Sequence, residues 1–310
     1  MKLNIVVPCY NEEEVLRETT KQLSALVDRM IAAKKIDSCD IVYIDDGSKD
    51  ATWSIIEELQ ATNSYVHGIK LAHNVGHQNA LWAGLEQRVD QCDAIVSIDA
   101  DLQDDIEAIE QMVDAYHEGC EVVFGVRKER KTDTFFKRQT ALGFYRLMRR
   151  LGVDIVYNHA DFRLTSQRVT KELMEYPERN MFLRGMVKGL GYKTKEVYYD
   201  RKERFAGESK YPLRKMINFA LDGITSFSVQ PLRLLIVFGF MVILFSLIAA
   251  IYALVTYLTG KAVAGWTSIL ISIWFIGGTI ILSLGVIGEY IGKIYKEVKR
   301  RPRYHIEKKL

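Results

Sequence analysis

Cysteine is scarce in this 310-residue sequence: its four copies all lie within the first 120 residues, and none has the C-x-x-C or other spacing of metal ligands. This excludes a small scaffold stapled by disulfides and indicates reduced thiols facing the cytosol. Only five prolines, with 26% charged and 48% hydrophobic residues, exclude a disordered chain. The sequence also contains no P-loop, no G-x-G-x-x-G motif after its first strand and no internal repeat. Its length predicts one or two domains with a sizeable core.

Charge is divided unevenly along the chain, although the net charge is only +3. Residues 1–126 contain 9 Lys and Arg against 24 Asp and Glu, a net charge of −15, whereas residues 127–310 contain 33 against 15, a net charge of +18. The acidic half favours a site that uses a cation, and the basic half favours contact with an anionic partner, either nucleic acid or a membrane surface.

Hydropathy selects the membrane rather than nucleic acid. Two apolar runs, Leu234–Leu258 and Trp266–Ile287, contain no charged residue, and each is long enough as a helix to cross about 30 Å of hydrocarbon. The alternative, a buried helical hairpin in a large soluble core, is disfavoured by this absence of charge. Neither run is a signal peptide, because the N-terminus reads directly into a strand.

The loops around the two runs predict their orientation. The connector carries one lysine, Lys261, whereas the segment after Glu289 carries eight Lys and Arg. Under the positive-inside rule the C-terminal tail is cytoplasmic, and two spans place the N-terminal domain on the same side of the inner membrane. Residues 212–231 have apolar residues at helical spacing and predict an amphipathic helix at the membrane interface, with a core helix of the soluble domain as the alternative.

The first 126 residues alternate between short Val- and Ile-rich runs and amphipathic segments, which predicts a parallel, doubly wound α/β sheet with ligands at the carboxyl ends of its strands. The predicted strands are Asn4–Val7, Ile41–Ile44, His67–Leu71, Ala94–Ile98 and Glu121–Phe124. The predicted helices are Glu13–Ala33, Thr52–Thr62, Gln78–Arg88 and Ile106–Glu118.

Acidic residues follow three of these predicted strands, in the segments PCYNEEE, DDGSKDAT and DADLQDD. Each segment alone is ordinary, since D-D-G-S also makes a turn and a helix cap, and a lone D-x-D is frequent. Together they bring carboxylates to one buried edge, where they repel one another unless a cation or a hydrogen-bonding ligand lies among them. Oxygen ligands without His or Cys favour Mg²⁺ or Mn²⁺, which usually bridge substrate phosphates, so a nucleoside diphosphate is the expected substrate.

Over nearly its whole length the sequence resembles a family 2 glycosyltransferase of the GT-A fold, which has a Rossmann-like, mostly parallel sheet. The segments VPCYNEEE, IDDGSKDAT, HNVGHQNALWAGL and DADLQDD match the nucleotide-sugar half of that family. The segments HADFRL, YPERNMFLRG, RFAGESKY, SFSVQPLR and GVIGEYIGKIYKEVKRRPRY resemble the polyisoprenyl-phosphate branch. Two of them, YPERNMFLRG and HADFRL, look more like bactoprenol glucosyltransferases than like dolichyl-phosphate mannose synthases.

The resemblance implies a role for each matching residue. The residues implied to hold the base and ribose of the nucleotide are Pro8, Tyr10, Glu12 and Asp45, with Asp46 nearby. Those implied to hold the metal on the diphosphate are Asp99, Asp101 and Gln103. Asp161 matches the family's catalytic base. Because a lipid phosphate is already mostly anionic at neutral pH, we expect this carboxylate to orient the acceptor or a sugar hydroxyl, or to take a residual proton. The alternative is a structural ion pair with Arg163.

An anionic acceptor requires cations near the metal, because two phosphates must approach each other. Arg127 follows a strand end, as in the family, and is expected to contact the lipid phosphate. The resemblance places Lys137 and Arg138 near the position where the family carries a further phosphate ligand. Arg204, Ser209 and Lys210 precede the interfacial helix and suit a lid that joins the site to the bilayer.

These features predict a metal-dependent hexosyltransferase. We expect inverting transfer of glucose from UDP-glucose to undecaprenyl phosphate at the cytoplasmic face, giving a glycolipid of the kind used in cell-wall or lipopolysaccharide decoration. UDP-N-acetylglucosamine, UDP-galactose and GDP-mannose stay open as donors. The predicted parts are a GT-A transferase domain, an interfacial helix region, a transmembrane hairpin and a basic cytoplasmic tail, at 1–211, 212–231, 232–288 and 289–310.

Two other functions compete with this one. A processive polysaccharide synthase of the same fold is disfavoured, because a Q-x-x-R-W motif is absent and two spans are too few to enclose a polymer channel. A membrane-anchored nucleotide-sugar sensor or scaffold is disfavoured by the intact Asp99, Asp101 and Asp161. The small residues Gly277, Gly278 and Gly285 permit close helix packing, and so a homo-oligomer.

Overall fold

The computed structural model describes residues 1–128, 159–179, 183–200, 229–259 and 265–310. These residues form two units, each of which is described by itself. The sheet unit contains residues 1–128, 159–179, 183–200 and 301–310, and the hairpin unit contains residues 229–259 and 265–300. The predicted interfacial helix, except for its last three residues, lies outside the described residues.

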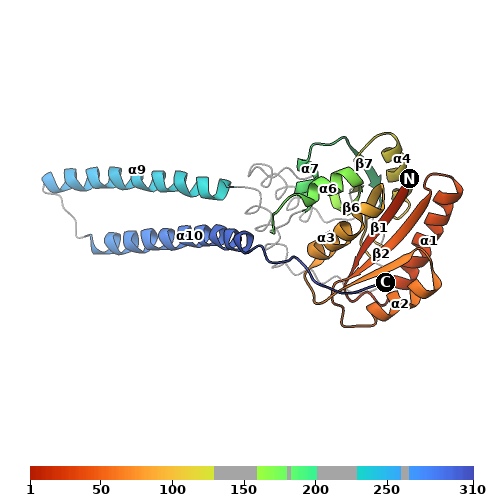
Figure 1. Cartoon of the computed structure of the whole chain (residues 1–310). Helices are drawn as coiled ribbons and strands as arrows, with labels where there is room; N and C mark the ends of the chain where they lie inside the picture. Colours follow the sequence, from red (N-terminus) through yellow and green to blue (C-terminus); the bar gives the residue numbers. More distant parts are fainter. Residues whose placement is uncertain (129–158, 180–182, 201–228, 260–264) are drawn as a thin grey trace. The chain divides into compact units, whose positions relative to one another are not determined.

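The sheet unit is built on one eight-stranded mixed sheet with the strand order β7-β5-β6-β4-β1-β2-β3-β8 (Figure 1). Four neighbouring pairs run parallel (β1/β2, β1/β4, β2/β3 and β5/β7), whereas β4/β6, β5/β6 and β3/β8 are antiparallel. The strands are β1 (Lys2–Cys9), β2 (Ser38–Asp45), β3 (Val66–Leu71), β4 (Ala94–Ser97), β5 (Val122–Arg127), β6 (His159–Ser166), β7 (Thr194–Tyr199) and β8 (Ile306–Lys309).

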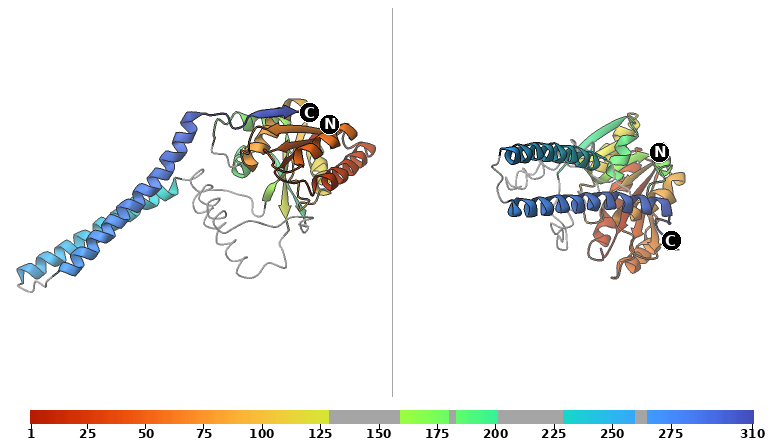
Figure 2. Two further views of the ribbon diagram at one scale, coloured as in Figure 1. Left: turned by 90° about the horizontal axis from the view of Figure 1, so that it is seen from below. Right: turned by 90° about the vertical axis from the view of Figure 1, so that its left-hand side faces the viewer.

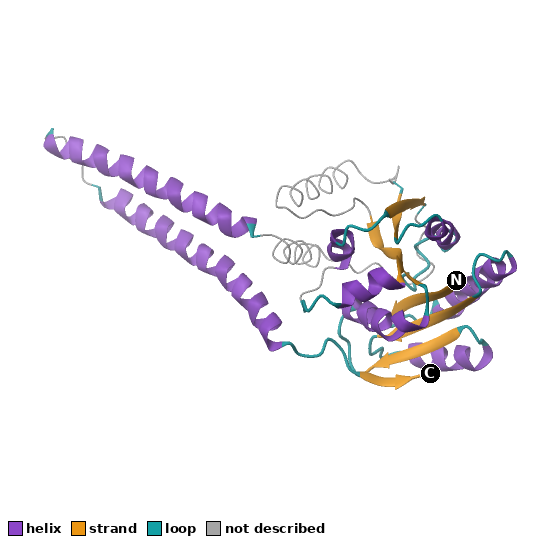
Figure 3. Ribbon diagram, turned by 45° about the horizontal axis from the view of Figure 1, so that its top comes forward, coloured by secondary structure: helices purple, strands orange, loops and turns teal. Residues whose placement is uncertain are grey.

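Helices cover both faces of this sheet, as the side-on view in Figure 3 shows. One hydrophobic core packs the sheet against α1, α2 and α4, and a second packs it against α3, α6 and α7. Their bounds are α1 (Leu16–Ala32), α2 (Thr52–Thr62), α3 (His77–Arg88), α4 (Ala108–His117), α6 (Gln167–Met174) and α7 (Leu183–Gly189). The nine strands and helices predicted from periodicity are all present, with ends that differ by up to three residues.

Helix α3 lies unusually close to the sheet because of a glycine. A Cβ built on Gly84 would lie 2.4 Å from Val6 Cγ1 and 2.9 Å from Ile44 Cγ1, so only glycine lets the helix backbone approach β1 and β2 this closely. The same helix carries the fully buried Trp82. Close packing fixes the amino end of α3 relative to the carboxyl ends of β1 and β2.

The chain direction around the sheet reverses at β1. From β1 the order runs through β2 to β3 on one side, while β4 lies on the other side. Such a switch point opens a crevice at the carboxyl ends of the two diverging strands, where α/β proteins bind ligands. The segments that follow β1, β2 and β4 are the three acidic segments singled out in the sequence.

Strand β6 inserts antiparallel between β4 and β5, which sequence periodicity did not predict. Its register pairs Ser97 with Arg163. Extending that register by two residues sets Asp161 opposite Asp99, so the HADFRL segment meets the DADLQDD segment although they lie about 60 residues apart. This insertion makes the sheet mixed rather than wholly parallel.

The C-terminal segment also contributes to the sheet. Strand β8 pairs antiparallel with β3, and Leu310 N donates to Gly68 O at 2.8 Å. Just before it, the Arg303 guanidinium lies 4.0 Å from the centre of the Trp82 ring and donates to Tyr176 O and Glu178 O. The end of the chain is thus fastened both to the sheet edge and to α3. The sequence predicted a basic tail here and not a strand of the sheet.

The hairpin unit consists of two long helices, α9 (Gln230–Leu258) and α10 (Trp266–Lys299), which Figure 2 shows from two directions. At 1.5 Å per residue, 29 and 34 residues are enough to cross about 30 Å of hydrocarbon. Large apolar side chains such as Phe245 and Trp274, each 75% exposed, point outward along them. Helix α10 continues beyond the predicted apolar run and ends at Arg300, which adopts a left-handed conformation with φ +45°.

Candidate functional site

Five acidic side chains gather at the carboxyl edge of β1, β2 and β4 and on the neighbouring strand β6. We call this group the acidic edge, and its members are Asp45, Asp99, Asp101, Asp104 and Asp161. Burial raises the pKa of the Cys9 thiol at the end of β1, and the charges of Glu12, Asp45, Asp99 and Asp50 raise it further. Asp99 in turn interacts with the charges of Asp104, Asp161 and Asp101. The residues predicted for the nucleotide and for the metal therefore lie around one point, as the strand order requires.

The loops after β1 and β2 are joined by hydrogen bonds. Asn11 N donates to Ser48 Oγ at 3.0 Å, Lys49 N donates to Asn11 Oδ1 at 2.8 Å, and Glu12 N donates to Thr52 Oγ1 at 2.9 Å. Tyr10, between them, is 42% exposed, so its ring is available to stack on a base. Pro8 is buried within β1, where it pairs in register with Ile44, and its predicted contact with the nucleotide stays a prediction.

The two adjacent aspartates after β2 differ in their surroundings. Asp46 accepts from Val75 N at 2.7 Å with one oxygen and from Gly76 N at 3.0 Å with the other, so it anchors the turn that begins α3. Gly76 has φ +87°, which favours glycine at this turn. Asp45 is fully buried, accepts from Ser48 N at 3.1 Å, and has a second oxygen with no hydrogen-bond partner among the described residues. Burial raises the pKa of both carboxyls. Asp45 is the better candidate for a nucleotide contact.

Asp99 and Asp101, the predicted metal ligands, follow β4. The pKa of Asp99 is raised, first by desolvation and then by the charges of Asp104, Asp161 and Asp101, and His77 opposes this. Asp101 is buried, and its Oδ1 accepts from Gln103 N at 3.1 Å, so Gln103 closes the turn with its backbone. Across the described ranges, no group of three or more His, Cys, Asp or Glu side chains has the arrangement of metal ligands.

This donor set fits a divalent cation that is completed by its substrate. Mg²⁺ usually takes one or two carboxylates from the protein and fills its remaining positions with water and phosphate oxygens. Asp99, whose ionised form is disfavoured by desolvation and by neighbouring negative charges, would gain from such an ion, because the cation offsets both effects. Asp99 and Asp101 would hold it.

Asp161, the predicted base, lies on β6 between His77 and Arg163. His77 Nε2, at the first residue of α3, is 3.4 Å from Asp161 Oδ2 and 3.7 Å from Asp99 Oδ1. On the other side, Arg163 Nη2 is 4.0 Å from Asp161 Oδ1, and Arg163 is almost wholly buried. The ion pair with Arg163 considered in the sequence analysis is therefore present, at long range. It does not remove Asp161 from the site, because the same carboxylate also faces His77 and the Asp99 side.

Arg127, the predicted contact of the lipid phosphate, ends β5 and pairs with Asp104. Its Nε and Nη2 donate to Asp104 Oδ1 at 3.0 and 2.8 Å, and Tyr199 Oη donates to the same oxygen at 2.6 Å. One quarter of the Arg127 side chain is exposed. The Arg127 guanidinium therefore lies at the border of the acidic edge, with Asp104 and Tyr199 on its buried side.

The remaining predicted residues lie outside the described part of the chain. Lys137 and Arg138 fall in 129–158, and Arg204, Ser209 and Lys210 fall in 201–228. Their expected roles at the acceptor phosphate and in a lid stay predictions.

Three residues of the site were not predicted. His77 lies within the segment HNVGHQNALWAGL and Asp104 within DADLQDD, so both belong to recognised motifs, but neither was given a role. Tyr199 reaches the site because β7 pairs in register with β5, which sets Tyr199 beside Arg127. Nothing in the sequence indicates that pairing.

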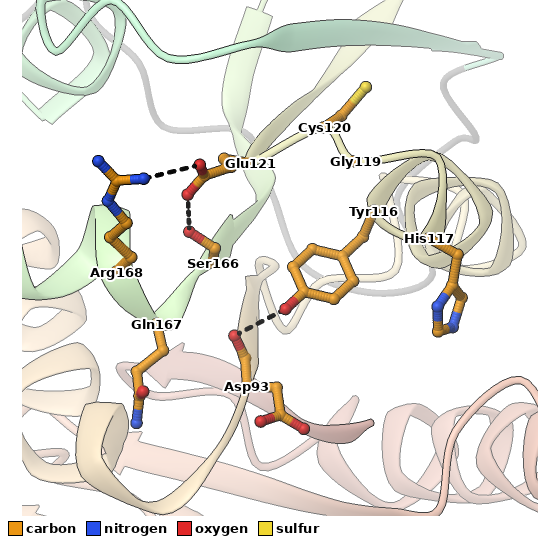
Figure 4. Close-up of a pocket in the computed structure, with 9 residues that line it drawn as sticks. All are labelled: Asp93, Tyr116, His117, Gly119, Cys120, Glu121, Ser166, Gln167 and Arg168. Carbon is orange, nitrogen blue, oxygen red and sulfur yellow. Dashed lines mark hydrogen bonds and ion pairs between the residues drawn. The ribbon is translucent and has the colours of Figure 1, made fainter.

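A pocket of about 500 Å³ lies at the opposite end of the sheet, where β4 and β5 begin and β6 ends (Figure 4). Its charged groups already have partners. Glu121 accepts from Ser166 Oγ at 3.0 Å and pairs with Arg168 at 3.4 Å, and Asp93 Oδ2 accepts from Lys2 N at 2.6 Å. Ser166 Oγ also caps α6. These residues serve the fold, and none was predicted as functional.

Comparison with known proteins agrees with this geometry. Residues 4–174 match the family described as Glycosyl transferase family 2. The chain is 56% identical to the glycosyltransferase YkoT of Bacillus subtilis over 306 residues, which cover 98% of this chain and 91% of that protein. It is 41% identical to the SfII prophage-derived bactoprenol glucosyl transferase of Shigella flexneri over 313 residues, which cover 99% of this chain and 98% of the relative.

Among solved structures, the glucosyl-3-phosphoglycerate synthase of Mycobacterium tuberculosis, solved with Mn²⁺, UDP-glucose and phosphoglyceric acid, matches with a TM-score of 0.47 and 18% identity. The match covers 72% of this chain and 77% of that one, and at this level we draw no argument from it. The sequence relatives are sufficient. This chain, with its mixed GT-A-type sheet and its acidic edge, belongs to glycosyl transferase family 2.

Proposed function

We propose that this protein transfers glucose from UDP-glucose to undecaprenyl phosphate, or to a closely related polyisoprenyl phosphate, with inversion at the anomeric carbon. The observation that carries the proposal is the acidic edge at the switch point of the sheet, in a chain that also forms two membrane-length helices. The relatives named bactoprenol glucosyl transferase, aligned over nearly the whole chain, support the choice of sugar and acceptor.

The reaction needs little proton transfer. An oxygen of the lipid phosphate attacks the anomeric carbon, the bond from that carbon to the diphosphate breaks, and UDP leaves. Asp45 and Tyr10 would hold the uridine, the first as a hydrogen-bond acceptor and the second by stacking. Asp99 and Asp101 would hold a divalent cation that offsets the charge on the departing diphosphate. Asp161, held between His77 and Arg163, would orient the acceptor or a sugar hydroxyl.

The membrane location is part of the proposal. Because β8 pairs with β3, the segment after α10 belongs to the same unit as the N-terminal strands. If α9 and α10 each cross the bilayer, this pairing requires both ends of the hairpin to be on one side. The eight basic residues after Glu289 favour the cytoplasmic side. An acceptor anchored in the same membrane would then be at high effective concentration near the site.

Purified full-length protein in proteoliposomes that contain undecaprenyl phosphate tests the proposal. With radiolabelled UDP-glucose and Mg²⁺, we expect label in the organic extract as a lipid-linked monosaccharide, in equal amount to the UDP released. EDTA should abolish the transfer, and added Mg²⁺ or Mn²⁺ should restore it. Asp161→Asn protein is the matched control.

A donor panel completes the test. UDP-N-acetylglucosamine, UDP-galactose and GDP-mannose should give at most a small fraction of the lipid product formed with UDP-glucose. A dominant product from one of these would correct the sugar. Label in a polymer, or donor binding without any transfer, would overturn the proposal in favour of a synthase or a sensor.

A further inference from the structure

The contact between Arg127 and Asp104 has a geometry that points beyond a simple ion pair. Both Arg127 nitrogens that reach Asp104 donate to one carboxylate oxygen, Oδ1, at 3.0 and 2.8 Å. The other oxygen, Oδ2, is buried without a hydrogen-bond partner among the described residues. Bidentate pairs usually use both carboxylate oxygens. Asp104 therefore binds only one edge of the guanidinium, the edge formed by Nε and Nη2.

This one-sided grip leaves donors available. A guanidinium has five N–H groups, and Asp104 takes the one on Nε and one on Nη2. The remaining N–H groups on Nη1 and Nη2 have no partner among the described residues. Since 25% of the Arg127 side chain is exposed while only 1% of the Asp104 side chain is, the available donors belong to the outward part of the pair.

Tyr199 fixes the carboxylate in turn. Its hydroxyl donates to Asp104 Oδ1 at 2.6 Å and accepts from Arg127 Nε at 3.2 Å. Burial raises the pKa of Tyr199, and the Asp104 charge raises it further, so the hydroxyl stays protonated and remains a donor. Desolvation alone would lower the pKa of Arg127, but Asp104 and Tyr199 outweigh it and the net pKa is raised.

Aromatic packing connects this network to β6. The Tyr199 ring packs edge-on against Phe162, with 5.3 Å between centroids, and Phe162 is the neighbour of Asp161 on β6. Phe162 is accommodated by Gly125, where a Cβ would lie 2.7 Å from Phe162 Cδ1. A continuous packed path therefore links Arg127 on β5, Tyr199 on β7 and Asp161 on β6.

We infer that Asp104 and Tyr199 are positioning residues that hold the Arg127 guanidinium by one edge, so that its opposite edge is presented to the phosphate of the acceptor. The inference rests on the proposed function, because it takes Arg127 as the contact of that phosphate. Neither Asp104 nor Tyr199 touches the substrates. Their effect is on acceptor use, and the nucleotide subsite around Asp45 and Tyr10 does not depend on them.

The test separates the two substrates. Asp104→Asn keeps the shape of the side chain and removes its charge, and Tyr199→Phe removes only the hydroxyl. We expect the KM for undecaprenyl phosphate to rise about tenfold or more in Asp104→Asn and about threefold in Tyr199→Phe, as for loss of a charge-assisted and a neutral hydrogen bond. The Kd for UDP should stay within twofold of wild type in both.

Two further comparisons exclude a merely structural effect. The matched controls Asp114→Asn and Tyr65→Phe break surface contacts, with Lys35 and Asp28 respectively. They should leave the KM for undecaprenyl phosphate and the Kd for UDP unchanged. In an Arg127→Ala background, which itself lowers acceptor use severely, Asp104→Asn should add little, because a positioning residue has no effect without the residue it positions.

Each outcome decides. An unchanged acceptor KM in folded Asp104→Asn protein, an equal loss of UDP affinity, or full additivity with Arg127→Ala overturns the inference while leaving the proposed function in place. If Asp104→Asn does not fold, Tyr199→Phe alone carries the decision by the same criteria. Failure of wild-type protein to glycosylate the lipid phosphate with any donor overturns the proposed function, and the inference falls with it.

Discussion

Both ends of the sheet carry acidic side chains, but the surroundings of these carboxylates differ between the two ends. At the amino ends of β4 and β5, Glu121 and Asp93 line a pocket, yet each carboxylate has its own donor from a side chain or a backbone amide. At the carboxyl ends of β1, β2 and β4, the acidic edge brings five aspartates together, and the pKa of Asp99 is raised by desolvation and by its acidic neighbours. The carboxylates of the pocket are satisfied by donors of the protein itself, whereas those of the acidic edge would be stabilised by a bound cation.

This difference shows why the shape of a pocket alone would select the wrong end of the sheet as the candidate site. The pocket in Figure 4 is well formed, and its residues cap helices and close loops. The acidic edge is recognised instead by its electrostatics, because the fold keeps carboxylates close together there although their charges repel one another. Groups with perturbed pKa values that face one another across strand ends are the stronger mark of function.

The largest expected effect is at the predicted metal ligands. Asp99→Asn or Asp101→Asn should lower the rate of glucosyl transfer about a thousandfold, because the negative charge that holds the cation is lost. The measurement is labelled glucose transferred to lipid per minute at saturating Mg²⁺.

Asp93→Asn, at the other end of the same strand, is the matched control and should transfer at nearly the wild-type rate. Equal losses in Asp93→Asn and Asp99→Asn would remove the distinction between the two ends.

Next in size is Asp161→Asn. We expect kcat to fall about a hundredfold or more, as for a group that acts on the reacting atoms, while the Kd for UDP stays near the wild-type value. Calorimetric titration of UDP alongside single-turnover transfer separates the two quantities. Turnover close to wild type would take Asp161 out of the site and leave it as the structural partner of Arg163.

Asp45 should give opposite effects on binding and on stability. Its folded-state pKa is raised by burial, so the ionised carboxyl costs folding free energy once the pH exceeds about 4, where the unfolded chain ionises. Asp45→Asn removes that cost. We expect Tm to rise by about 2 °C at pH 7, with no gain below about pH 4, and UDP affinity to fall about tenfold.

Thermal unfolding of the purified protein at pH 7 and pH 4, with calorimetric titration of UDP, measures both effects. A lower Tm together with unchanged UDP binding would show that Asp45 is a structural acid, like its neighbour Asp46.

The smallest effects belong to the paired charges of the far pocket. Glu121→Gln and Arg168→Ala should each change transfer by less than twofold and the free energy of unfolding by about 0.5 kcal/mol, since the pair is partly exposed. Denaturant unfolding and the transfer assay report these values. A large loss of transfer in either variant would contradict the assignment of this pocket to the fold.

Much of the sheet unit could be predicted because local pattern and tertiary environment agree there. The strands β1 to β5 are apolar runs of Val and Ile, and the helices between them have one apolar face, so periodicity identifies both. Strand β6 could not be found in this way. It carries the polar residues Asp161, Arg163 and Thr165 in buried positions, where hydropathy predicts apolar residues.

The positions of the candidate site residues at strand ends could be predicted in part, whereas their roles stay predictions. Position at a strand end identified Asp45, Asp99 and Asp101, but it did not separate Asp45 from Asp46. Adjacent residues on a strand point to opposite sides, and only the fold shows that Asp46 meets the amides that begin α3. Strand β8 has a single apolar residue in Ile306–Lys309, and the hydrogen bonds that make it a strand are supplied by the edge of β3.

Strand β8 has a consequence for the order in which the protein is made. Strand β8 follows both hydrophobic helices in the sequence, so the edge of β3 stays unpaired until those helices have been synthesised. Closure of that edge becomes a late step of biogenesis, available only to chains whose final segment has returned to the side where the N-terminal strands fold. A chain inserted with the wrong topology would keep an unpaired edge at β3, which is open to pairing with other chains.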